Sequence, residues 1–293
     1  MQVAIHLGAH CTDEDRLLKT LLQNKGRFAK DCISVPGPGR YRITMVRAAQ
    51  KLRGAQASGE SRDVLLDTIV DDDSAQRVVL THENFICVPG RIFENGILYD
   101  KAAYKPLWLR QLFPGLQVEF FLGIRNPATF IPAVFYHPGQ EIKKFENFLD
   151  GVDLDQVRWS DVILSIRETN PDCPLTVWCN EDTPLIWPQV IQEVSGHDPS
   201  TEVNGGFAVL GKIMKREGMQ RLRAYLGTHP PQNEIQRRRI LVAFLDKYAL
   251  EDEVEEELDV PGWTDALVHS LTQNYEDDLD EIGRMPGVNF ISP

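Results

Sequence analysis

Four short segments rich in β-branched and aromatic residues most strongly constrain how this chain can fold. They cover residues 2–7, 77–81, 117–124 and 175–179. Nearly continuous apolar runs of this length are typical of parallel strands that helices cover on both faces. Stretches with helical periodicity separate the segments, so we expect a mostly parallel sheet built from right-handed βαβ units.

The helical stretches extend this prediction to the whole chain. They are residues 13–24, 41–53, 140–150 and 156–168 and, after about residue 204, where strand signals stop, residues 206–226, 232–249 and 263–284. The expected fold class is α/β, a three-layer αβα arrangement with a helical carboxyl-terminal region. Residues 1–204 are expected to form the core, and residues 205–293 to pack on it within the same domain because the 232–249 helix has an apolar face.

Composition narrows the class of protein. The net charge of −12 disfavours non-specific binding to nucleic acid or to an anionic membrane, and the acidic run at 251–257 is expected to be solvated. No signal peptide and no apolar run long enough to cross a bilayer are evident. The five cysteines include no C-x-x-C pair, which favours free thiols in a reducing compartment. These features predict a cytoplasmic protein, and they leave its oligomeric state open.

The segment between the first expected strand and the first expected helix lies where α/β nucleotide-binding proteins place a phosphate loop. It reads Gly-Ala-His-Cys-Thr-Asp-Glu-Asp from Gly8 to Asp15. This segment resembles the 5′-phosphosulfate loop of bacterial sulfotransferases, which typically runs G-A-H-K-T-G-T-T. Gly8, Ala9, His10 and Thr12 match that pattern in order.

Four later segments resemble further elements of the same family, in the same order. Residues 80–85 (LTHENF) resemble its S-S-E-N-F strand end, residues 122–127 (LGIRNP) its R-x-P element, residues 177–182 (VWCNED) its Y-E-D-L strand end, and residues 274–279 (NYEDDL) its closing Y-x-x-D-L helix. Each match is loose, but their order and spacing agree. The resemblance therefore extends over most of the chain.

The resemblance implies a P-loop-type fold that binds 3′-phosphoadenosine 5′-phosphosulfate (PAPS). It further implies transfer of the sulfuryl group to a hydroxyl or amine on a small-molecule or carbohydrate acceptor. The donor-binding residues that it implies are Gly8, Ala9, His10, Cys11, Thr12, Arg16 and Arg125. As general base we predict Glu83, with His82 and His10 as further candidates, because an attacking hydroxyl must lose a proton. An alternative is that Glu83 and His82 simply satisfy the strand end by hydrogen bonding.

The loop departs from the family where its chemistry depends on particular residues. Cys11 replaces the phosphate-binding lysine, and a neutral thiol supplies no cation. Asp13 replaces a glycine, while Glu14 and Asp15 replace two threonines. Two like charges about 4 Å apart in a partly shielded site repel by roughly 4 kcal/mol, so these carboxylates disfavour phosphate. Arg16 compensates only if it turns inward.

The altered loop also has a purely structural interpretation. Thr12 is expected to cap the first helix, with Asp15 completing a capping box, and the acidic residues suit the positive end of the helix dipole. The protein's own carboxylates would then fill the anion site. This interpretation predicts a catalytically inactive protein that keeps the sulfotransferase fold for binding or as a scaffold.

A metal-dependent enzyme is a third interpretation. His6, His10, Cys11 and His82 are expected near neighbouring strand ends, and histidine and cysteine side chains together can hold zinc. Their spacing matches no familiar zinc pattern. We therefore predict no metal site.

Overall fold

The structure is a computed structural model, and it describes residues 1–250 and 260–293, so the acidic run at 251–257 lies outside the described residues. Its sheet consists of β1 (Gln2–His6), β2 (Ile33–Ser34), β3 (Arg77–Thr81), β4 (Gln117–Ile124), β5 (Leu175–Cys179) and β6 (Val288–Ile291). The strands are all parallel, in the order β2-β3-β1-β4-β5-β6. The predicted α/β class and all four predicted strands are confirmed.

Helices fill the connections between the strands. They are α1 (Arg16–Gln23), α2 (Lys25–Phe28), α3 (Pro38–Leu52), α4 (Gly59–Ile69), α5 (Lys105–Arg110), α6 (Pro127–Phe135), α7 (Phe145–Phe148), α8 (Trp159–Thr169), α9 (Thr183–Ser195), α10 (Leu210–Ile213), α11 (Arg216–Thr228), α12 (Glu234–Tyr248) and α14 (Asp265–Ile282). The helix predicted at 140–150 is a single turn, α7. Upstream of it, the Gln140 side chain donates to the Ile142 carbonyl at 2.7 Å and holds that backbone in a turn instead.

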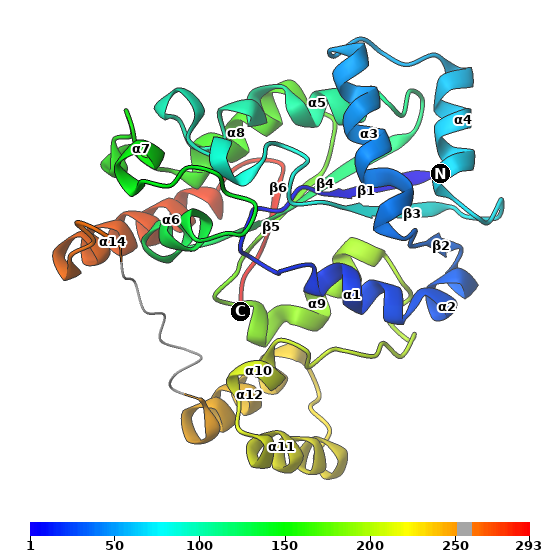
Figure 1. Ribbon diagram of the computed structural model, residues 1–293. Helices are drawn as coiled ribbons and strands as arrows, with labels where there is room; N and C mark the ends of the chain where they lie inside the picture. Colours follow the sequence, from blue (N-terminus) through cyan, green and yellow to red (C-terminus); the bar gives the residue numbers. More distant parts are fainter. Residues whose placement is uncertain (251–259) are drawn as a thin grey trace.

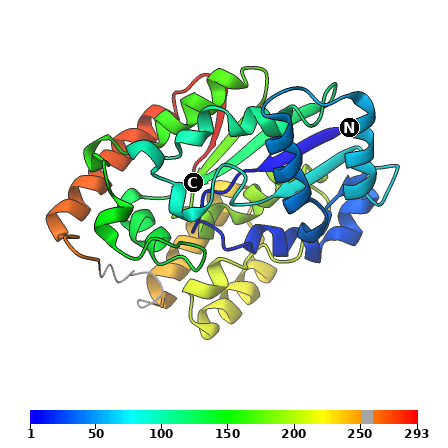
Figure 2. The ribbon, with the colours of Figure 1, turned by 45° about the horizontal axis from the view of Figure 1, so that its top comes forward.

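The sheet separates two apolar cores, which makes the three layers visible in Figure 1. Alternate residues of a strand point to opposite faces. In β1, Val3 and Ile5 therefore join the core beneath α3, α5 and α8, whereas Ala4 joins the core beneath α1 and α9. Figure 2 shows the same layers from a turned view, with α3 and α4 at the opposite end of the molecule from α14.

The carboxyl-terminal region differs from the prediction in two ways. Strand β6 pairs with β5, so the sheet includes a strand well beyond residue 204. The four residues of β6 are too few for a strand pattern to be recognised in the sequence. The helix expected at 206–226 is broken into α10 and α11. The apolar face of α12 packs mainly on these two helices through Leu241, with Leu185 of α9 at the edge of that cluster.

In residues 1–250 and 260–293, each helix is either too short or too polar to span a bilayer.

Candidate functional site

The candidate site lies at the carboxyl ends of β1, β3 and β4, where three loops meet. Ligand sites in open α/β sheets form at this edge. The loop after β1 carries residues 7–15, the loop after β3 carries His82 and Glu83, and Arg125 follows β4 directly. The site residues predicted from sequence are thus brought to one edge of the sheet.

The first half of the β1 loop continues the sheet instead of cradling a ligand. Ala9 N–H donates to the Gly123 carbonyl at 2.9 Å, and Gly123 N–H donates to the Gly8 carbonyl at 2.8 Å. His10 N–H donates to the Tyr99 hydroxyl at 3.0 Å. Backbone donors at Ala9 and His10, which a phosphate loop would turn toward its ligand, therefore have protein partners.

Position 8 of the β1 loop can be occupied only by glycine. Its φ is +105°, and a Cβ added there would lie 3.0 Å from Glu83 Cα. Only glycine combines that backbone conformation with so close an approach. The loops after β1 and β3 are consequently in backbone contact, which fixes Glu83 beside the β1 loop.

The predicted capping box is wrong. Thr12 Oγ1 donates to the Ala9 carbonyl at 2.7 Å, and α1 begins only at Arg16, after Asp15 in a left-handed conformation with no side-chain cap bond. Cys11, Glu14 and Asp15 all have positive φ, so the helix cannot start earlier. The carboxylate of Asp13 instead accepts the Leu17 N–H at 3.0 Å.

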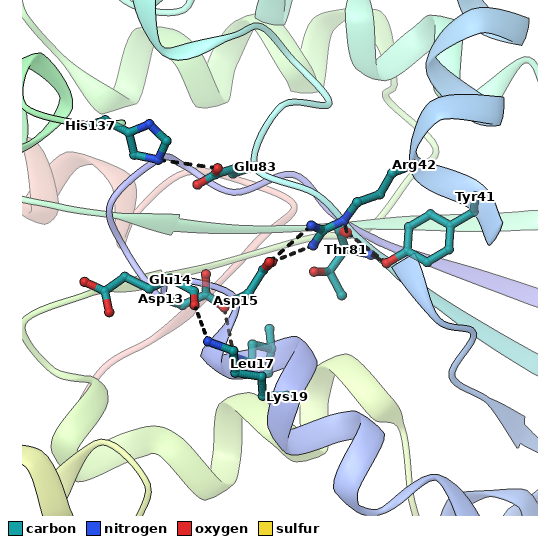
Figure 3. Close-up of polar contacts among 10 residues, drawn as sticks. All are labelled: Asp13, Glu14, Asp15, Leu17, Lys19, Tyr41, Arg42, Thr81, Glu83 and His137. Atoms are coloured by element: carbon teal, nitrogen blue, oxygen red, sulfur yellow. Dashed lines mark hydrogen bonds and ion pairs between the residues drawn. The ribbon is translucent and has the colours of Figure 1, made fainter. Parts of the chain in front are cut away.

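The three carboxylates of the loop lie in different surroundings (Figure 3). Asp15 accepts from Arg42 at 3.1 and 2.5 Å, a two-pronged ion pair between the β1 loop and α3. Burial alone would raise the Asp15 pKa, but the hydrogen bonds and charge of Arg42 outweigh it and hold that pKa below its ordinary value. Arg42 also donates to the Thr81 carbonyl at 3.0 Å, which ties the loop to the end of β3.

Arg16 does not turn toward the candidate site. It donates to the exposed Glu14 carboxylate at 2.9 Å, and Lys212 lies 3.7 Å from the same carboxylate. The cation that offsets the negative charge of the loop is therefore Arg42 of α3. Arg42 lies at the start of the helix expected at 41–53, and the sequence contains no signal that pairs it with Asp15.

Arg125 directly follows the carboxyl end of β4, the strand predicted over residues 117–124. Its Nη1 donates to the Cys11 carbonyl at 2.7 Å, and its Nε donates to Thr129 Oγ1 at 3.0 Å. Arg125 is 7% exposed. It joins the end of β4 to the β1 loop, and its guanidinium already has protein oxygens as hydrogen-bond partners.

His10 is held between two partners. Its Nδ1 lies 2.6 Å from the Tyr99 hydroxyl and its Nε2 lies 2.8 Å from Asn84 Oδ1. Burial lowers the His10 pKa to about 4, so the ring is neutral near pH 7. With both nitrogens engaged, His10 is poorly placed to take a proton from a substrate.

Glu83 is the better placed of the predicted bases. Burial raises the pKa of Glu83. Its Oε1 lies 3.5 Å from His137 Nε2, and the charge of His137 lowers that pKa but does not outweigh burial (Figure 3). Burial lowers the pKa of the adjacent His82 to about 4. The buried Nδ1 of His82 has no hydrogen-bond partner among the described residues.

The zinc interpretation gains no support from the geometry. His10 is committed to Tyr99 and Asn84, and the His6 ring stacks on Trp178 with centroids 5.5 Å apart. In the part of the chain that the structure describes, no three histidine, cysteine, aspartate or glutamate side chains are grouped so as to hold a metal ion.

Three of the four later segments that carry the resemblance, residues 122–127, 177–182 and 274–279, meet around Asn126. The Glu181 carboxylate accepts the Asn126 N–H at 2.7 Å and the Tyr275 hydroxyl at 3.2 Å. Asp278 accepts the N–H of Trp159 at 2.7 Å at the start of α8. These residues support the loop that follows β4, so they contribute to the architecture of the site.

Comparisons with family models, curated proteins and solved structures found no match to this chain.

The residues around the loop do not fit the PAPS donor that the sequence resemblance implies. The position of the family's lysine holds Cys11, and the Leu17 N–H at the start of α1 is taken by the carboxylate of Asp13. Arg125 is engaged by the Cys11 carbonyl. A phosphosulfate group would have to displace these internal contacts and approach two carboxylates.

Three residues of this edge were not predicted from the sequence. Tyr99 and His137 come from connections far along the chain and carry no local motif. Asn84 lies within the segment that resembles S-S-E-N-F, and that match was the available signal.

Proposed function

We propose that this chain is a sulfotransferase-like α/β protein that binds a small ligand and has lost transfer from PAPS. One observation carries the proposal: the Asp13 carboxylate accepts the Leu17 N–H at the amino end of α1. Helix amino ends bind anions because their N–H groups lack partners within the helix. Here an internal anion takes that place.

The neighbouring contacts support the same proposal. Asp15 is neutralised by Arg42, and the N–H groups of Ala9 and His10 bond to protein oxygens. A loop whose polar groups are paired internally in this way stabilises the carboxyl-terminal edge of the sheet without a ligand. A ligand would then bind at another place along that edge, and the fold would serve as its scaffold.

Calorimetry with adenosine 3′,5′-bisphosphate tests the proposal. The wild-type protein should show no saturable binding at micromolar concentrations, because phosphate meets carboxylates and no lysine. The combined variant Cys11→Lys, Asp13→Gly, Glu14→Thr, Asp15→Thr should bind measurably, since it gains a cation and frees both Arg42 and the Leu17 N–H.

Two further variants keep this test interpretable. The pair Cys11→Lys and Asp13→Gly leaves the Asp15–Arg42 ion pair in place, so it serves if the combined variant does not fold. Glu14→Thr alone is the matched control, because Glu14 is exposed and should not affect binding. Tight binding by the wild type, or folded variants that bind no better, would contradict the proposal.

A second candidate function, acid–base catalysis, is favoured by Glu83. A half-buried carboxylate whose pKa is raised by burial and which lies beside a histidine suits a role in proton transfer. Incubation with labelled PAPS and mixed hydroxyl acceptors tests for retained transfer. Turnover by the wild type that disappears in Glu83→Gln would favour this candidate over the first.

A further inference from the structure

A cavity of about 470 Å³ opens beside the candidate site, on the side of the sheet that α3 and α5 cover. The segment after β3, the two basic residues Lys101 and Lys105, and the turn that follows α6 form its walls. Its size is in the range of small-molecule sites. None of the donor-binding residues that the resemblance implies lines it.

The charges that line the cavity are mainly positive, although the chain as a whole carries −12. Arg91, Lys101 and Lys105 line it together with one carboxylate, Glu141. Outside the lining, Glu94 pairs with Lys101 at 2.5 Å and lies 3.8 Å from Arg91. Glu94 therefore offsets part of the positive charge of Lys101 and Arg91, and Lys105 is left as the lining cation farthest from such compensation.

Lys105 differs from the other cations in its partners. Its ammonium lies 4.3 Å from the centre of the Trp108 ring, and none of the described carboxylates forms an ion pair with it. Burial lowers its pKa, and the nearby Lys101 charge adds to that effect. An anion placed at the Lys105 ammonium would stabilise its charged form.

The remaining lining suits an apolar body. Phe85 and Ile86 are buried, Val46 and Ile142 are partly buried, and all four face the cavity. Small-molecule sites combine such a lining with a few polar groups that fix the ligand's orientation. The cavity wall thus combines apolar side chains with cationic ones.

We infer that this cavity binds an organic anion, with its acid group at the Lys105 ammonium and its apolar body against Phe85 and Val46. The inference rests on the proposed function, since it names the ligand class of a binding protein. Asn84 joins the cavity to the candidate site, because it lines the cavity and its Oδ1 accepts a hydrogen bond from His10 Nε2 at 2.8 Å. A bound ligand would therefore lie one residue away from the β1 loop.

Three probes with one aromatic body test the inference: 1-naphthoate, 1-naphthyl phosphate and the neutral 1-naphthol. At low salt, calorimetry should show at least one acid binding saturably and about tenfold or more tighter than 1-naphthol. The two acids separate a carboxylate site from a phosphate site. Trp108 fluorescence provides a second reading, because the acid group would lie near the ammonium that covers its ring.

Lys105→Met should remove the advantage of the acids while leaving 1-naphthol unchanged, and Lys105→Gln serves as a second variant. Lys30→Met is the matched control, because Lys30 is exposed beyond the other face of the sheet. Acids that bind no tighter than 1-naphthol, that do not saturate, or that keep their advantage without Lys105 overturn the inference. None of the probes carries adenosine, so this outcome is independent of the bisphosphate experiment.

Discussion

The β1 loop and the neighbouring cavity use charge in opposite ways. In the loop, Asp13 and Asp15 each have an internal partner, the Leu17 N–H and the Arg42 guanidinium. In the cavity, Lys105 faces open space and has an aromatic ring in place of a carboxylate. Removing one partner of a partly buried ion pair leaves the other charge uncompensated, whereas a cation that faces a cavity without a carboxylate partner is available to a ligand. Four measurements can break or sharpen this contrast.

Arg42→Met should have the largest effect on stability. It leaves the half-buried Asp15 carboxylate and the Thr81 carbonyl without their donor. We expect the free energy of unfolding to fall by about 2 kcal/mol, less than for a fully buried pair because Asp15 is partly solvated. Urea denaturation measures it. Arg40→Met, which removes an exposed ion pair with Asp71, is the control and should change little; equal losses in both variants would contradict the role of Arg42.

Acid should destabilise the loop through His82. Its folded pKa of about 4 lies below the ordinary 6.5, so the unfolded chain takes up the proton first. The stability that neutral His82 provides is therefore complete above pH 6.5 and is lost progressively as pH falls toward 4.

Comparison with His82→Gln isolates this contribution, because Glu83 and the other titrating groups are common to both proteins. The difference in unfolding free energy between wild type and variant should shrink over that pH range. A difference that stays constant from pH 7 to pH 4 would show that His82 is not held neutral.

Asp13→Ala should have a smaller effect. The Leu17 N–H loses its side-chain acceptor, and loss of such a cap costs about 1 kcal/mol. Thermal unfolding measures the loss. Glu14→Ala is the matched control, since Glu14 is exposed and should change stability by less than about 0.5 kcal/mol. If the two variants behaved alike, the carboxylate of Asp13 would not be holding the helix end.

Lys105→Met should have the smallest effect. Its contact with the Trp108 ring is offset by burial and by the nearby Lys101 charge, so the free energy of unfolding should change by no more than about 0.5 kcal/mol. Urea denaturation in the absence of ligand checks this. A loss as large as that of Arg42→Met would mean that Lys105 stabilises the fold, and the contrast between the two regions would fail.

The sequence alone determined the class of fold and the positions of four strands. Long apolar runs such as residues 117–124 leave little choice of structure, because both faces must be buried. The same run also places Arg125 directly after the carboxyl end of its strand, whereas the pairing of β4 with β1 comes from the structure. The sequence did not predict β2 or β6, because two and four residues are too short for periodicity to be recognised.

The tertiary structure decided what each charge does. From sequence, Asp15 was expected to complete a helix cap and Arg16 was the expected compensating cation. The fold instead pairs Asp15 with Arg42, 27 residues away, and turns Arg16 to Glu14. An ion pair depends on distances of a few ångströms between separate elements, and these are set by how α3 and the β1 loop pack on the sheet. The cavity beside Lys105 has the same origin, because its walls come from segments that are distant in sequence and meet only in the folded chain.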